Sequence, residues 1–114
     1  MEASPPEPID DLAGVVSAFN SHSLSTRDRS NIALTWTAPD NNGEGIQRYM
    51  LQMLHPQTGE WVNVQTYIPA SHHYYTHQNL SSLVERPDGY TYQVKSMNTD
   101  GWSDPSNIVQ VFTL

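Results

Sequence analysis

The sequence lacks cysteine, is poor in basic residues and has no long apolar run. Without cysteine, neither a disulfide framework nor a thiolate metal site is available. Five Lys and Arg against twelve Asp and Glu give a formal net charge of −7, so the basic surface that nucleic-acid binding requires is missing. The same charge disfavours docking on an anionic membrane. Because no apolar run approaches about 18 residues, we expect no membrane insertion.

The length of 114 residues fits a single domain. A chain of this size can bury roughly 65% of its unfolded surface, which is enough for one modest core. Residues 1–8 (MEASPPEP) are acidic and rich in proline, unlike a secretory signal, and predict an extended arm before a domain over residues 9–114. Met1 at the start and the end directly after the last predicted strand slightly favour a complete small protein over a fragment.

Short segments in which apolar and polar residues alternate follow the arm. Ile32, Leu34 and Trp36 show this period of two most clearly. Residues 17–31 are polar and predict a long loop, and no segment has a helical period. The pattern predicts an all-β, seven-stranded antiparallel sandwich. Its expected strands cover residues 12–16, 32–36, 49–54, 61–67, 74–80, 90–94 and 109–113.

Alternation also assigns each side chain to a buried or an exposed face of the sandwich. The side chains expected in the structural core are those of Trp36, Tyr49, Leu51, Tyr90, Tyr92 and Val94. The opposite face of the same strands is unusually apolar, because it carries Met50, Leu54, Met97, Ile108 and Phe112.

A sandwich's outer face is normally polar, so an apolar stripe there indicates a surface for a partner. Trp102, in a predicted loop, adds a candidate aromatic anchor. The alternative is that the first loop or the N-terminal arm covers the stripe. The candidate partner-binding residues are therefore Trp102, Met50, Leu54, Ile108 and Phe112.

Three ordered patterns resemble the fibronectin type III family. They are residues 34–39 (LTWTAP), residues 46–53 (IQRYMLQM) and residues 90–98 (YTYQVKSMN) continued by 101–106 (GWSDPS). The resemblance covers roughly residues 9–114 and implies a Greek-key sandwich with Trp36 in the core and Tyr90 at the tyrosine corner. The chain departs from the family in the long segment 17–31 and at Val84, where the family usually has leucine.

Two clusters are candidate metal sites. His73, Tyr75 and His77 would share one face of a strand, but no third ligand accompanies the two imidazoles, so an ordinary polar strand face is favoured. Residues 40–45 (DNNGEG) have the early oxygen ligands of a calcium loop, but Leu51 stands where the bidentate Glu belongs, which favours a solvated turn. We expect no metal, no cofactor and no catalytic residue, and hence not an enzyme.

The leading hypothesis is a protein-interaction or structural module that presents loops and one sheet face to a protein partner, including another copy of itself. It fits either a cell-adhesion-type module of a longer extracellular or cell-surface chain or a small protein that decorates a virion, such as a phage head or tail. The alternative is a carbohydrate-binding or accessory module of a polysaccharide-active enzyme. That role needs exposed rings aligned on one platform, and the candidates are Trp61, Tyr67, Tyr75 and Trp102.

Overall fold

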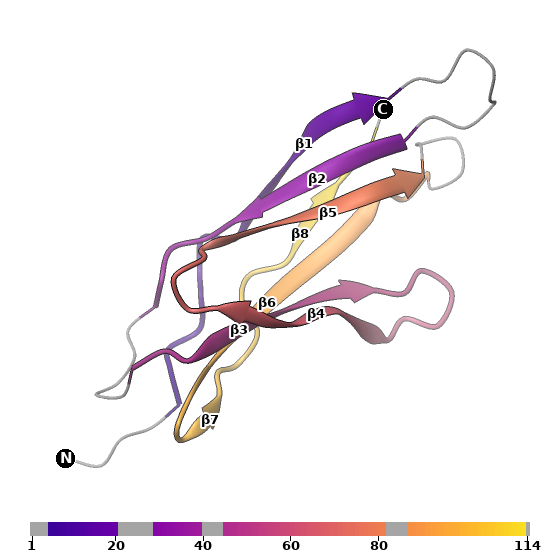
Figure 1. The fold of residues 1–114 in the computed structure, drawn as a ribbon. Coiled ribbons are helices and arrows are strands. Elements are labelled where there is room, and N and C mark those ends of the chain that lie inside the picture. Colours follow the sequence, from indigo (N-terminus) through magenta and orange to yellow (C-terminus); the bar gives the residue numbers. More distant parts are fainter. Residues whose placement is uncertain (1–4, 21–28, 40–44, 82–86, 114) are drawn as a thin grey trace.

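A computed structural model describes residues 5–20, 29–39, 45–81 and 87–113. Within these ranges the chain forms eight strands and no helix, arranged as two antiparallel sheets that face each other (Figure 1). The all-β antiparallel sandwich predicted from the sequence is confirmed. Its strands are β1 (Ala13–Asn20), β2 (Arg29–Thr35), β3 (Arg48–Leu54), β4 (Trp61–Pro69), β5 (Tyr74–Ser81), β6 (Tyr90–Asn98), β7 (Gly101–Trp102) and β8 (Val109–Val111).

The three-stranded sheet has the order β1–β2–β5, and the five-stranded sheet has the order β4–β3–β6, with β7 and β8 both pairing with the other side of β6. The chain changes sheet between β2 and β3, between β4 and β5, and again between β5 and β6. This is Greek-key connectivity. It leaves β4 and β5 as the terminal strands of their sheets on one side of the sandwich, and β1 and β8 on the other.

The strand count of seven and the loop at residues 17–31 need correction. The eighth strand is β7, so Trp102 lies in a short strand rather than a loop. Within the expected loop, β1 continues to Asn20 and β2 already begins at Arg29. Their pairing has a register shift between Val16 and Ala18. Ladder hydrogen bonds join backbone groups and need no apolar side chain, so a polar stretch of strand escapes a prediction based on alternation. Three internal segments lie outside the described residues. They are residues 21–28, residues 40–44, where the sequence predicts a turn, and residues 82–86, which include Val84.

The core lies between the two sheets and is centred on β2, β3 and β6. Trp36 packs edge-on against Tyr49, with ring centroids 5.3 Å apart and planes at 66°. Tyr49, Leu51, Tyr92 and Val94 have no exposed surface. The structure thus places all six residues expected in the core among its buried members, which are Ile9, Leu12, Ile32, Leu34, Trp36, Tyr49, Leu51, Ile68, Leu80, Tyr90, Tyr92, Val94 and Val111.

Residues 103–106 separate β7 from β8 and still bind β6. Backbone N–H groups of Ser103 and Ser106 donate to the carbonyls of Ser96 and Val94. In return, the Ser103 hydroxyl accepts from Ser96 N (3.0 Å) and the Ser106 hydroxyl accepts from Val94 N (2.9 Å). Pro105 has no N–H to donate to a ladder. The two serine hydroxyls therefore satisfy β6 amides that a regular edge strand would pair, which explains the serines in the GWSDPS motif.

The segment before β1 is docked along the sandwich rather than free. Ile9 and Leu12 are buried, and the Asn107 side chain bonds both the N–H and the carbonyl of Leu12. Asp11 Oδ1 accepts a hydrogen bond from Thr37 N at 3.0 Å. Hydrogen bonds from Thr37 hold the pKa of the Asp11 carboxyl below its ordinary value. These contacts tie the entry of the chain to the loops at one end of the sandwich.

Removing the central indole should destabilise the fold strongly. Trp36→Ala is expected to lower the free energy of unfolding by about 3–5 kcal/mol, because it deletes a large buried aromatic side chain. Ile108→Ala is the matched control, since Ile108 is 61% exposed, and it should change stability by no more than about 0.5 kcal/mol. Urea unfolding followed by fluorescence measures both. Equal midpoints for the two variants would contradict the placement of Trp36.

Two tyrosines with no exposed surface should respond oppositely to loss of the hydroxyl. The Tyr49 hydroxyl and the Trp36 indole N–H are both buried without a hydrogen bond of good geometry. Burial raises the pKa of Tyr49, and the interaction with Trp36 opposes this only in part. The Tyr92 hydroxyl instead shares a hydrogen bond with His77 Nδ1 at 2.8 Å. We expect Tyr49→Phe to leave stability unchanged or raise it by up to about 1 kcal/mol, and Tyr92→Phe to lower it by about 1–2 kcal/mol. Denaturant unfolding of the pair tests this, and a larger loss for Tyr49→Phe would refute the assignment.

Candidate interaction surface

The outer face of the five-stranded sheet, meaning its side away from the core, carries the predicted partner-binding residues of β3. The register of β3 with β6 arranges this face in rows: Arg48 stands opposite Met97, Met50 opposite Lys95, and Gln52 opposite Gln93. Met97 in turn pairs with Trp102 of β7. Met50, Leu54 and Trp102 are all half-buried. Trp102 and Met97 therefore lie in the row of Arg48, and Met50 lies in a different row beside Lys95.

At one end of the outer face, Arg48 joins two aromatic rings from flanking strands. Its guanidinium carbon lies 5.5 Å from the centroid of the Tyr67 ring and 5.2 Å from that of Trp102. Its Nε also donates to Met97 Sδ at 3.4 Å. We call Tyr67, Arg48, Met97 and Trp102 the Arg48 ladder. Trp102 therefore has part of its surface engaged by its own chain, and it is less available as an anchor than a loop residue would be.

The middle of the outer face is polar. Gln93 Nε2 donates to Gln52 Oε1 at 2.8 Å, and Gln52 Nε2 donates to Asn63 Oδ1 at 3.1 Å. This chain of amides runs across β6, β3 and β4, and both glutamines are buried. Lys95 stands beside Met50 in the next row. The expected apolar stripe is thus interrupted, because its members are separated by hydrogen-bonded amides and a lysine.

Two exposed apolar side chains of this sheet lie beside β8. Ile108 is 61% exposed and Phe112 is 50% exposed, whereas Val111 between them in the chain points into the core. A Cβ added to Gly89 would lie 3.0 Å from Phe112 Cδ1, so the ring rests against the turn before β6. We call Ile108 and Phe112 the β8 edge. It presents apolar surface that the described residues leave open to solvent.

The histidine cluster does not form a ligand set. His77 bonds Tyr92, and His73 lies just before β5, edge-on to Tyr49 with ring centroids 6.0 Å apart. In the part of the chain that the structure describes, no three His, Asp or Glu side chains gather as a metal site would require.

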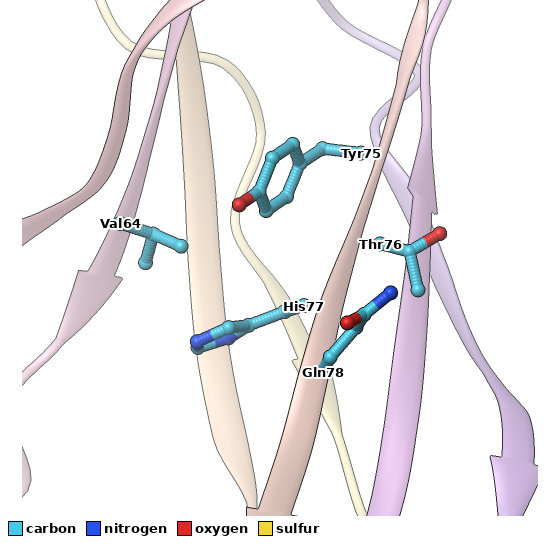
Figure 2. Close-up of a pocket in the computed structure, with 5 residues that line it drawn as sticks. All are labelled: Val64, Tyr75, Thr76, His77 and Gln78. Carbon is cyan, nitrogen blue, oxygen red and sulfur yellow. The ribbon is translucent and has the colours of Figure 1, made fainter.

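The four rings considered for sugar stacking do not share a platform. Tyr67 and Trp102 both contact Arg48, and Trp61 pairs with Leu54 across β3 and β4. Tyr75 instead packs against the core and points between the sheets (Figure 2). These rings therefore cannot bind one extended ligand together.

Sequence reasoning missed the Arg48 ladder and the amide chain. The signal for the ladder is only indirect, because the aromatic partners of Arg48 come from strands distant in sequence. The amide chain has a clearer signal, since Gln52 and Gln93 occupy outward positions in the two central strands. Alternation of hydrophobicity alone therefore predicts neither the Arg48 ladder nor the amide chain.

Comparison with known proteins gives one family and several similar folds. A family model described as "Fibronectin type III domain" matches residues 17–112. Similar solved structures include the titin kinase with its flanking domains (TM-score 0.61, 24% identity, 93% of this chain and 16% of that chain). A second is a crystal structure of several titin domains (TM-score 0.60, 24% identity, 95% and 32%). A third is the FN1–FN3 domains of chicken CNTN1 (TM-score 0.65, 18% identity, 96% and 34%).

These identities are low, so the similarity to solved structures carries the fold alone. The chain spans about a third or less of each chain that it resembles.

The Arg48 ladder should be detectable as a coupling energy. In a double-mutant cycle on unfolding free energies, Arg48→Met and Trp102→Ala should couple by about 0.5–1 kcal/mol, as a cation–π contact at a partly exposed site does. Trp102→Ala alone should cost about 1–2 kcal/mol, because the ring is half-buried. A control cycle of Arg48→Met with Phe112→Ala should be additive within about 0.5 kcal/mol. Additivity in both cycles would mean that Arg48 and Trp102 do not interact.

Proposed function

We propose that this chain, which belongs to the fibronectin type III domain family, is a non-catalytic module that presents the outer sheet face to a protein partner. Domains of the family commonly serve as interaction or structural units in larger chains and are in general not catalytic. The observation that carries the proposal is the β8 edge. Ile108 is 61% exposed and Phe112 is 50% exposed, and they flank β8, whose Val111 is buried in the core.

The chemical groups of the outer face fit a protein partner. The β8 edge and the Arg48 ladder supply apolar and aromatic side chains, and the amide chain with Lys95 between them supplies polar groups. Protein interfaces combine such apolar anchors with hydrogen-bonding groups. The net charge of −7 steers basic partners toward the chain and repels nucleic acid.

Of the two settings considered, a module of a longer extracellular or cell-surface chain has the better support. The three similar structures each contain several domains, and this chain corresponds to a fraction of each. Domains of this family are commonly extracellular. None of the described residues forms a helix long and apolar enough to cross a membrane. No observation supports decoration of a virion.

The β8 edge can be tested by placing a charge on it. The variant Ile108→Lys/Phe112→Lys and the control Val15→Lys, which is 62% exposed on the other sheet, should fold equally well. We expect the first to lose association that the wild-type chain and the control retain, because a buried unpaired charge is costly in an interface. Light scattering after size-exclusion chromatography measures association with a second copy, and affinity capture from extracts of the source organism measures association with other proteins.

The comparison between variants decides the outcome. Loss of a defined oligomer, or of a specific captured protein, in the β8-edge variant alone would support the proposal. Identical behaviour of all three chains in both measurements would contradict it.

A further inference from the structure

One edge of β5 carries backbone groups that no described strand uses. β5 is the terminal strand of its sheet and pairs only with β2. Trp36 N donates to His73 O at 3.1 Å, and such hydrogen-bonded pairs alternate along an antiparallel ladder. Every second residue from His73 onward, which includes Tyr75, therefore bonds β2. The residues between them, Tyr74 and Thr76, direct their N–H and C=O groups to the open edge.

The space beside this edge is open to solvent. A hollow of about 530 Å³ lies between β5 and β4, and four consecutive residues of β5 line it. Figure 2 shows Tyr75 and His77 projecting toward Val64 of β4. Thr76 lies between them in the chain and its side chain points the other way, so it borders the hollow with its backbone. The hollow thus exposes the edge of a strand rather than a set of side-chain ligands.

The other terminal strands are blunted in ways that β5 is not. β4 has two register shifts against β3 and ends at Pro69. β1 has one register shift against β2, and β8 is three residues long. Bulges twist an edge away from a partner, and proline removes a donor. β5 instead pairs with β2 without a shift from Tyr74 to His77, so this part of its open edge is regular.

Charge, another device that blocks edge pairing, is missing as well. All five Lys and Arg and all twelve Asp and Glu lie outside the stretch from Trp61 to Val84, which contains β4 and β5. A basic peptide strand, which the net charge of −7 would attract, finds no carboxylate on either strand. A second copy of the chain brings an edge that is equally uncharged. Two acidic molecules can therefore meet here without like charges opposite each other.

We propose that β5 pairs antiparallel with β5 of a second copy, which joins two three-stranded sheets into one continuous sheet. A two-fold axis near Thr76 relates the copies, and the backbone groups of Tyr74 and Thr76 form the new hydrogen bonds. On the inner side, Tyr75 and His77 of each copy lie across from those of the other and cover the hollow. The dimer leaves both β8 edges free, because β8 lies on the other side of the sandwich.

Light scattering of the full chain over a range of concentrations tests the dimer. We expect the mass to approach twice the 12.8 kDa of one chain as the concentration rises. Thr76→Lys should weaken dimerisation at least about tenfold, because it brings two lysines together near the two-fold axis. Val15→Lys is the matched control, since it adds the same charge to the same row of the sheet, two strands from the edge. It should change the affinity by less than about threefold.

The variants also separate a binding role from a structural one. Thr76 and Val15 point to the outer face of their sheet, so both variants should keep the wild-type melting temperature within a few degrees. If Thr76→Lys melts early, Tyr74→Lys replaces it, because Tyr74 is on the same edge and is 55% exposed. It should also weaken dimerisation.

Amide hydrogen exchange followed by NMR identifies the paired edge. In the monomer, the Tyr74 and Thr76 amides should exchange quickly, whereas the Tyr75 and His77 amides bond β2 and should exchange slowly. In the dimer, protection should extend from every second residue of this stretch to every residue. Thr76→Lys should keep the alternating pattern at all concentrations. An interface formed by side chains alone would not produce this change.

Three results would overturn the proposal. The wild-type chain could stay monomeric up to about 1 mM, which would leave the edge to a strand of another protein. Thr76→Lys could dimerise as well as the wild-type chain, or the Tyr74 and Thr76 amides could exchange equally fast at all concentrations. A dimer lost only in Ile108→Lys/Phe112→Lys would overturn this proposal and support the one for the outer face, so the two fail separately.

Discussion

Pairing of β3 with β6 sets the positions of nearly everything else in this protein. The two strands align from Arg48 opposite Met97 to Met53 opposite Tyr92 without a register shift, whereas β3 meets β4 with two. Because side chains alternate, burial of Tyr49 and Leu51 on one strand and of Tyr92 and Val94 on the other leaves a single register that serves both. A slip of one residue would turn four buried side chains to solvent and bring Lys95 into the core.

The outer face follows from this constraint. Once the inward residues are in place, Arg48, Met50, Gln52 and Leu54 must all point outward, and their neighbours across the sheet are decided by the same register. Gln52 meets Gln93 and completes a buried hydrogen bond, and Arg48 reaches rings on β4 and β7. The hydrogen-bonded amides in the middle of the face therefore separate the apolar side chains at its two ends. An interface on this face would consist of two apolar contact regions with hydrogen-bonding groups between them, rather than one continuous apolar strip.

The sequence was most informative where burial and alternation coincide, and least where backbone bonding acts alone. The strand around Trp36 and the two central strands were located correctly because each has an inward apolar set with a period of two. The outer parts of β1 and β2 were missed, since their ladder continues through polar residues such as Asn20 and Arg29. β7 was missed because two residues carry no period. The apolar stripe was assigned from hydrophobicity, and the amides that divide it become evident only when strand pairing is known.

The two sides of the sandwich differ in how they are closed. On the β1–β8 side, a Cβ on Gly14 would lie 2.7 Å from Val111 Cγ2, so a larger residue there would have to displace the core side chains between the sheets. On the β4–β5 side, Val64 and Tyr75 pack against the core but stay half-buried, and with His77 they line an open hollow. No Asp, Glu, Lys or Arg occurs between Trp61 and Val84, so neither terminal strand of the open side has a charged side chain that would block pairing with another strand edge.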